Sequence, residues 1–242
     1  MPDEENTLRR FIRSVLLRIY SRDPYFEEFE RITGGLFESA VSDALYKIFV
    51  GGVNSLAFWS NRRAANEERD ILQAYVEDKD KDKRPDEREE KVRRLKSARK
   101  LAEELGSFAA LVEGHDIIRT LRVQDFEEDT RNLEEAFGER GRYTFIIRGY
   151  DILNSLIGSL PLLLQLARGY GTYRGWKPDS RTMRTIESLY NNAQLVNIGS
   201  DIASAFLRVG IAMHAYEEFK KLRRRGYLVQ ETEDGYRLVR PN

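Results

Sequence analysis

Arg208 and His214 are separated by five residues, and Tyr216 follows two positions after the histidine. Histidine titrates near neutral pH, so it can take up and release a proton during a reaction. An arginine guanidinium can hold a phosphate group with two donors. This combination suits cleavage of a phosphodiester such as RNA, provided that the chain brings the two side chains together.

The Arg-x5-His-x-Tyr spacing resembles the Arg-x4–6-His motif of HEPN ribonucleases, helical proteins that place the pair at a dimer interface. By that resemblance Arg208 would stabilise the phosphate, His214 would act in acid–base transfer and Tyr216 would support them. Positions six apart on one continuous helix point well away from each other, so the motif needs a break at Gly210. A metal-independent ribonuclease is therefore one alternative function, and a non-catalytic role is favoured over it.

A second group of residues suits phosphate contact without catalysis. The run from Lys220 to Arg225 has five basic residues in six positions, and Arg237 lies further along the chain. Such residues can contact the phosphates of a nucleic acid, but they also complement the C-terminal end of any helix. From Gly171 to Asn242 the chain carries 12 Lys and Arg against 8 Asp and Glu, a modest positive excess. Both explanations of the basic run stay open.

The elements around the basic run follow from local signals. Tyr216, Phe219 and Leu222 lie on one face of a predicted helix, which Gly226 ends. Two strand-like runs around an Asp-Gly turn then predict a hairpin over 227–240. Helix, glycine and hairpin together resemble the recognition helix and wing of winged-helix nucleic-acid-binding domains. Three helices, over 182–189, 200–206 and 211–225, would complete that unit.

The winged-helix resemblance implies DNA or RNA as a partner. The residues that would contact it are Lys220, Lys221, Arg223, Arg224, Arg225 and Arg237.

Composition excludes several classes of site. The 242 residues include 40 basic and 40 acidic side chains, so no whole-protein field attracts nucleic acid or an anionic membrane. The absence of cysteine excludes disulfides, thiolate metal sites and a cysteine nucleophile, and it agrees with a reducing cytoplasm. Two histidines leave little material for a histidine-based metal site. We expect no metal and no cofactor.

Two apolar stretches, Leu45–Trp59 and Ile152–Ala167, raise the question of a membrane. Both fall short of the roughly 20 apolar residues that a span needs, and both contain polar or charged residues. They are predicted to be buried core helices, with no transmembrane span. Contact with a membrane surface stays open, because the basic residues of 61–63 and 168–177 directly follow the two stretches.

The predicted fold is mainly α, a helical bundle with a C-terminal winged-helix-like unit that ends in a β-hairpin. Residues 1–170 form the bundle, with an exposed charged connector over 77–91, and 171–180 form a linker before the unit of 181–242. Glycine pairs at 34–35 and 51–52, and Gly158-Ser159, are expected to interrupt helices, and Ser159 could cap the next one. Tyr170, Tyr173 and Trp176 near the linker could stack on single-stranded bases or anchor the linker to the core.

The favoured interpretation is a cytoplasmic, non-catalytic nucleic-acid-binding regulator or accessory factor. Its helical part would serve self-association or partner binding, so a homo-oligomer or a protein complex is expected. A third alternative is a helical scaffold or assembly subunit whose hairpin pairs with a neighbour.

Overall fold

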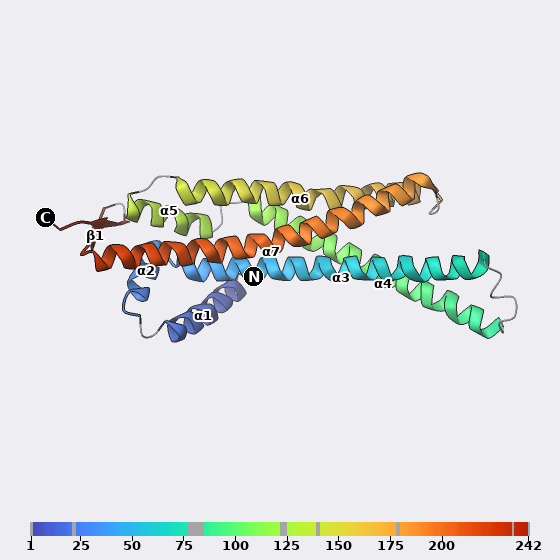
Figure 1. The fold of residues 1–242 in the computed structure, drawn as a ribbon, viewed down its shortest axis with the longest axis horizontal. Helices are drawn as coiled ribbons and strands as arrows, with labels where there is room; N and C mark the ends of the chain where they lie inside the picture. The colour runs from blue at the N-terminus through green and yellow to red at the C-terminus, as the bar shows by residue number, and fades with distance from the viewer. Residues whose placement is uncertain are drawn as a thin grey trace. The chain divides into compact units, whose positions relative to one another are not determined.

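A computed structural model describes residues 2–20, 23–76, 85–121, 125–138, 141–177, 180–233 and 235–241. Seven helices and one antiparallel hairpin make up these ranges, which confirms the mainly helical prediction with a terminal hairpin (Figure 1). The helices are α1 (Pro2–Ile19), α2 (Phe26–Thr33), α3 (Leu36–Val76), α4 (Pro85–Leu121), α5 (Asp125–Phe137), α6 (Arg142–Tyr173) and α7 (Arg181–Arg224). The strands are β1 (Leu228–Thr232) and β2 (Gly235–Val239).

The glycine pair at 34–35 interrupts the helices as expected. Gly34 has a φ of 76° and Gly35 a φ of 102°, a left-handed backbone that favours glycine. A Cβ on Gly34 would also lie 2.7 Å from Oδ1 of Asp129. The chain therefore changes direction here, and α2 packs near α5 (Figure 1).

Three other predicted breaks are wrong. Gly51-Gly52 lies inside α3, Gly158-Ser159 lies inside α6, and the turn predicted at 208–210 lies inside α7. A glycine costs a helix interior only about 1 kcal/mol relative to alanine, which the packing of a long helix can offset. Ser159 therefore caps no helix, and the three helices predicted over 182–225 are one helix of 44 residues.

The chain forms two compact units, and they differ from the division predicted at 171–180. Unit 1 consists of residues 1–49, 118–156 and 200–242, and unit 2 of residues 50–117 and 157–199. α3, α4, α6 and α7 each contribute residues to both units. α6 extends to Tyr173, so the first part of the predicted linker is helical. Most of the predicted connector of 77–91 lies outside the described residues, and its last residues belong to α4.

Unit 1 has an aromatic core. Phe26, Phe29, Phe37, Tyr216 and Phe219 are buried, and neighbouring rings lie 5.2–6.1 Å apart, centroid to centroid. The C-terminal hairpin packs its partly buried Val229, Tyr236 and Leu238 against this core, and β2 lies against α5. The aromatic core thus joins α2, the start of α3 and the end of α7 within unit 1.

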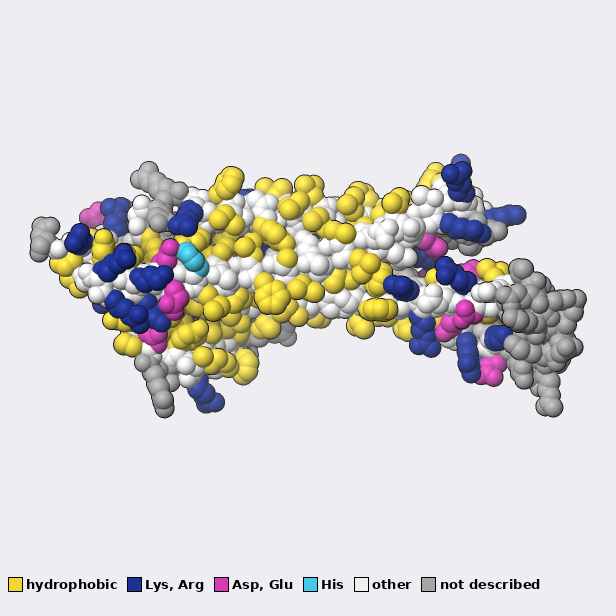
Figure 2. Space-filling view, in the orientation of Figure 1, with side chains coloured by type: hydrophobic (Ala, Val, Ile, Leu, Met, Phe, Trp, Pro, Cys, Tyr) yellow, Lys and Arg dark blue, Asp and Glu magenta, His cyan; other side chains and the backbone are white. Residues whose placement is uncertain are grey.

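Unit 2 has a smaller apolar core, formed by Val53, Ala57 and Ala109 with the partly buried Leu105 and Val112. Many of its larger apolar side chains are on the surface, among them Leu56, Leu111 and Leu163, which are at least 60% exposed, although Phe58, Met183 and Tyr190 are buried. Figure 2 shows yellow hydrophobic side chains on the surface over α6 and α7.

Two described helices, α6 and α7, are long and apolar enough to cross a membrane, judged by length and composition. Only 28% and 39% of their most apolar 18-residue windows are buried. The apolar stretch within Ile152–Ala167 was predicted to be a buried core helix, whereas Ile152, Leu156, Leu160 and Leu166 are all more than half exposed.

Candidate functional site

Charged side chains fill the interior of unit 1 where α3, α4, α6 and α7 meet. We call them the inner charge cluster: Asp43 and Lys47 of α3, Arg119 of α4, Asp151 of α6, and Asp201 and Arg208 of α7. Five of the six are at most 6% exposed, and Arg119 is half-buried. Lys, Arg and Asp are almost never fully buried in proteins unless they are paired, so their pairing decides what the cluster can do.

Arg208 is the most buried cation of the cluster, at 1% exposure. Its Nη2 lies 2.6 Å from Oδ1 of Asp151, its Nε lies 3.5 Å from Oδ2 of Asp43, and its Nη1 donates to Ser204. Asp43 also binds Arg119, with 2.7 Å between Oδ1 and Nη2. The planar guanidinium of Arg208 thus links α7 to both α3 and α6.

Lys47 and Asp201 form the second half of the cluster. Nζ of Lys47 lies 3.9 Å from Oδ1 of Asp201 and 3.5 Å from Oγ1 of Thr120. Asn154 donates to the same Asp201 oxygen at 3.4 Å, and its own Oδ1 accepts from Ser200. Each of the four helices therefore contributes polar atoms to both halves of the cluster.

The cluster contains three cations and three carboxylates, so its formal charges cancel. Buried ion pairs seldom add much net stability, because desolvation offsets the attraction, but breaking one is costly. The arrangement therefore fixes the mutual placement of four helices within unit 1. Within it, Arg208 lies close to two carboxylates at once.

A separate polar site lies inside unit 2. Glu113 of α4 is 2% exposed, and its Oε2 accepts hydrogen bonds from Nδ2 of Asn54 at 2.7 Å and from Nδ2 of Asn197 at 2.8 Å. Both donors are themselves buried. Gly158 of α6 leaves space for this carboxyl, since a Cβ there would lie 2.0 Å from Oε1 of Glu113. The four helices of unit 2 thus converge on one acidic group.

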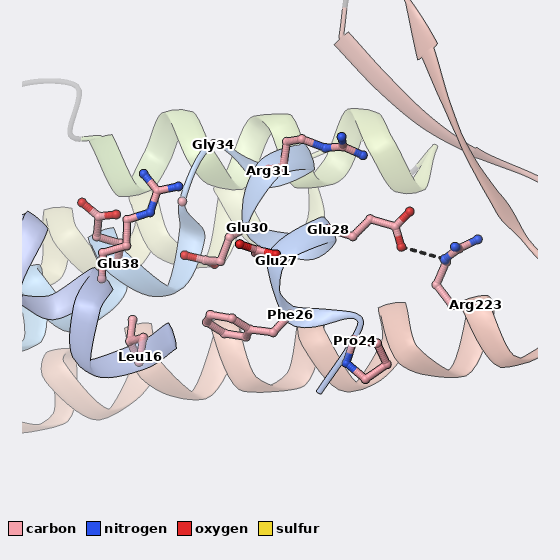
Figure 3. A pocket seen from close by; sticks show the side chains of 12 residues that line it. Leu16, Pro24, Phe26, Glu27, Glu28, Glu30, Arg31, Gly34, Glu38 and Arg223 are labelled. Atoms are coloured by element: carbon pink, nitrogen blue, oxygen red, sulfur yellow. Dashed lines mark hydrogen bonds and ion pairs between the residues drawn. The ribbon is translucent and has the colours of Figure 1, made fainter. Parts of the chain in front are cut away.

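A pocket of about 790 Å³ opens beside α2 in unit 1 (Figure 3). Charged residues of both signs line it: Arg13, Glu27, Glu28, Glu30, Arg31, Glu38 and Arg223. Arg223 pairs with Glu28 across one edge, with 2.9 Å between Nε and Oε2. The pocket is polar enough to hold water or a small charged ligand.

Glu30 is the perturbed group of this pocket. The pKa of its carboxyl is raised to about 7, mainly by burial and also by the nearby Glu38 carboxylate, while a hydrogen bond from the Phe37 N–H at 2.9 Å opposes the shift. Glu30 is therefore poised to titrate at neutral pH.

The structure does not bring the predicted ribonuclease pair together. Arg208 is buried against Asp43 and Asp151, whereas the side chain of His214 is 54% exposed and lies 3.1 Å from the Tyr143 hydroxyl, measured from Nδ1. α7 continues through Gly210, so the break that the motif requires is absent. Tyr216 belongs to the aromatic core.

The residues predicted to bind nucleic acid divide into two sets. Lys220 pairs with Asp23 at 3.2 Å, and Arg223 pairs with Glu28 and donates to the Tyr227 carbonyl, so both have structural partners. Lys221, Arg224, Arg225 and Arg237 are exposed at the end of α7 and on β2. Only this second set is accessible to a phosphate backbone.

The residues of the inner charge cluster other than Arg208 were not predicted as a site. A signal for them exists in the sequence, because Asp43, Lys47, Asp151 and Asp201 are single charges in or beside apolar stretches. Among the described residues, no group of three or more His, Asp or Glu side chains could hold a metal ion.

The fold and the sites thus define a helical protein with a small set of buried charged groups and many exposed apolar side chains. No family model matches the chain, and neither the curated proteins nor the solved structures contain a significant match.

Proposed function

We propose that the chain is an integral membrane protein whose α3, α4, α6 and α7 cross the bilayer, with charged groups held inside. The crossing segments would be residues 39–61, 105–121, 149–167 and 188–216, called the membrane segments below. The observation that supports this best is the inverted pattern of burial along them. The membrane segments contain eight Asp, Glu, Lys and Arg side chains, and all except Arg119 are buried. The buried ones are Asp43, Lys47, Glu113, Asp116, Asp151, Asp201 and Arg208.

The exposed positions of these segments are largely apolar. In α3 they are Leu45, Ile48, Phe49, Gly52, Leu56 and Trp59, and in α6 they are Gly149, Ile152, Leu153, Leu156, Leu160, Leu163 and Leu166. A monomeric soluble protein rarely exposes such contiguous faces, and charged residues inside a membrane almost always face the interior of a bundle. Lipid chains are the environment that fits this surface.

Three of the four segment lengths agree with a bilayer, whereas that of α7, with about 29 residues and about 44 Å, is longer than the hydrocarbon core. The membrane segment of α6 has about 19 residues and a length of about 28 Å, against roughly 30 Å for the hydrocarbon core. That of α3 has about 23 residues and a length of about 34 Å. The shortest, in α4, has about 17 residues, which is the lower limit for a span. It includes Arg119, whose charge is paired with Asp43 and whose guanidinium lies over the Tyr46 ring at 4.3 Å.

Residues typical of a membrane interface lie at or just after the ends of two of the segments. Tyr170, Tyr173 and Trp176 come after the α6 segment and alternate with Arg168, Arg174 and Lys177. In α3, Trp59 precedes Arg62 and Arg63, and the guanidinium of Arg62 lies 5.9 Å from the Trp59 ring centroid. Aromatic side chains beside basic ones suit the headgroup region, and this explains the aromatic group better than base stacking does.

A second copy of the chain is the other candidate for covering the apolar faces. In both units, however, all four long helices carry exposed large apolar side chains, for example Leu56, Phe108, Leu163 and Val196 in unit 2. One interface covers one patch, whereas lipid covers every outward face. The scaffold alternative therefore explains less of this surface.

Membrane fractionation tests the proposal. The full chain should stay in the membrane pellet after an alkaline carbonate wash and should be released by detergent. Leu156→Lys with Leu163→Lys places two charges on the outward face of α6 and should abolish stable insertion. Thr172→Lys, on an exposed position of α6 beyond the segment, is the matched control and should insert normally. A wild-type protein that stays monomeric in detergent-free buffer would refute the proposal.

A further inference from the structure

The two oxygens of Glu113 have different surroundings. Oε2 accepts the two amide hydrogen bonds from Asn54 and Asn197. Oε1 points to the backbone of α6, and Oδ1 of Asn197 approaches the same place. A Cβ built on Gly158 would lie 2.0 Å from Oε1 of Glu113 and 3.3 Å from Oδ1 of Asn197. Two acceptor oxygens therefore lie close to the same buried position beside Gly158.

Asn197 makes the arrangement informative. Its side chain is 1% exposed, and its Oδ1 accepts no hydrogen bond from the residues that the structure describes. A buried carbonyl oxygen without a donor is costly. A proton on Oε1 of Glu113 would supply that donor. Together with the Nδ2–H to Oε2 bond, it would close a two-bond ring between a carboxylic acid and a carboxamide.

We propose that Glu113 is a proton-binding site, in which the carboxyl binds a proton on Oε1 and donates it to Oδ1 of Asn197. Binding forms one O–H bond with a proton taken from water, removes the negative charge of the carboxylate and involves no oxidant or reductant. Release of the proton leaves the charged Oε1 next to Oδ1, and these two acceptor oxygens repel each other. The Asn197 side chain must then move or rotate. The proton thus controls a contact that joins α4 to α7 beside α6.

Other titratable groups lie along the same helices. Asp116 is three residues after Glu113 on α4, Asp201 is four residues after Asn197 on α7, and Tyr190 is seven residues before it. Lys47 is seven residues before Asn54 on α3, and Asp151 is seven residues before Gly158 on α6. Along α4 the nearest carboxyl after Glu113 is therefore Asp116, and its variant belongs in the test.

The proposal deepens the membrane assignment, but its test does not depend on that assignment. Infrared difference spectra are recorded over a pH series in H₂O and D₂O, in detergent or, if the chain is soluble, in buffer. The purified full chain carries Glu30→Gln throughout, because the raised pKa of Glu30 would give a carboxylic-acid band of its own. A carboxylic-acid C=O band that shifts on deuteration is expected. Glu113→Gln should remove it, while Asp116→Asn and Glu103→Gln, an exposed control on α4, should retain it. Asn197→Leu removes the acceptor and should move the band to higher frequency.

Three results would overturn the proposal. They are the absence of a band at every pH at which the chain is folded, a band that persists in Glu113→Gln, and a band that disappears on adding Na⁺ at constant pH. The last would assign the site to a metal cation. Glu113→Gln should fold, because its amide can repeat the ring with Asn197. If the chain fractionates as soluble but the band behaves as expected, the membrane proposal fails and the proton site stands.

Discussion

Nη2 of Arg208 lies 2.6 Å from Oδ1 of Asp151, and both side chains are almost completely buried. Arg208→Met should lower the free energy of unfolding by about 3–5 kcal/mol, because it leaves a carboxylate buried without its cation. Thermal or denaturant unfolding measures the loss. Val196→Met introduces the same side chain at an exposed position of α7 and should change stability by less than about 0.5 kcal/mol. Arg208→Met with Asp151→Leu should be more stable than Arg208→Met alone, and an equal or lower stability would contradict the pairing.

The pocket beside α2 makes stability depend on pH. The folded chain raises the pKa of Glu30 to about 7, so between its ordinary value and pH 7 the folded state holds a proton that the unfolded state releases. Stability therefore decreases as pH rises through this window, by at most about 3 kcal/mol, and levels off above it. Unfolding curves across the window should show this slope in the wild type and a reduced slope in Glu30→Gln. Glu27→Gln, exposed in the same pocket, should keep the full slope.

Substitutions of Gly158 and Gly149, both on α6, allow a matched comparison of stability. A Cβ at Gly158 would meet Oε1 of Glu113, whereas nothing lies within 4 Å of the corresponding position at Gly149. Gly158→Ala should cost about 1–3 kcal/mol in unfolding free energy, because the carboxyl must shift inside a packed core. Gly149→Ala should be neutral or stabilising by up to about 1 kcal/mol. Equal effects of the two substitutions would show that Glu113 does not occupy the space at Gly158.

The absence of native cysteine allows single-cysteine mapping of the outward faces. In native membranes Leu156→Cys and Leu163→Cys should react slowly with a polar, membrane-impermeant maleimide, because thiols in hydrocarbon remain protonated and inaccessible. Thr172→Cys, exposed beyond the membrane segment of α6, should react readily once the reagent reaches its side of the membrane. All three should react after denaturation in SDS. Rapid labelling of Leu156→Cys in intact membranes would argue against a span there.

Nucleic-acid binding by the C-terminal end of the chain stays a prediction, and the structure shows which of its basic residues are exposed. Lys221, Arg224 and Arg225 are exposed, whereas Arg223 is paired with Glu28, so the informative variant replaces the first three by Ala. Fluorescence anisotropy with duplex DNA, single-stranded DNA and RNA should then show weaker binding to every sequence and a shallower salt dependence. Replacing Arg62, Arg63 and Arg174, which are exposed elsewhere, by Ala removes the same charge and is the matched control. If the wild type binds none of the three nucleic acids at low salt, the prediction is wrong.

The sequence predicted the elements that depend on local signals. The hairpin was expected over 227–240 and pairs residues 228–232 with 235–239. The glycine pair at 34–35 ends one helix and precedes the next, because its left-handed backbone is a local property. The pairs at 51–52 and 158–159 looked alike in sequence but do not break a helix. Tertiary packing decided these cases, and it is not visible in a local pattern.

The candidate sites were harder to predict for a related reason. Asp43, Asp151 and Asp201 lie outside the two predicted apolar stretches, and Lys47 counted only as a charge within one of them. In the structure these residues mark the inside and the leucines mark the outside. Burial of a charge depends on a partner from another helix, and Asp151 with Arg208 are 57 positions apart in sequence. No spacing within one helix could have identified that pair.

The exact charge balance of the inner cluster restricts how this chain can change over time. A mutation that removes Lys47 or Arg208 leaves a surplus aspartate, and a mutation of Asp201 leaves a surplus cation, so each first step is harmful by itself. Two changes that remove opposite charges restore neutrality together. Homologous sequences are therefore expected to retain all six charges or to lose them in pairs drawn from different helices, as correlated substitutions between α3, α4, α6 and α7.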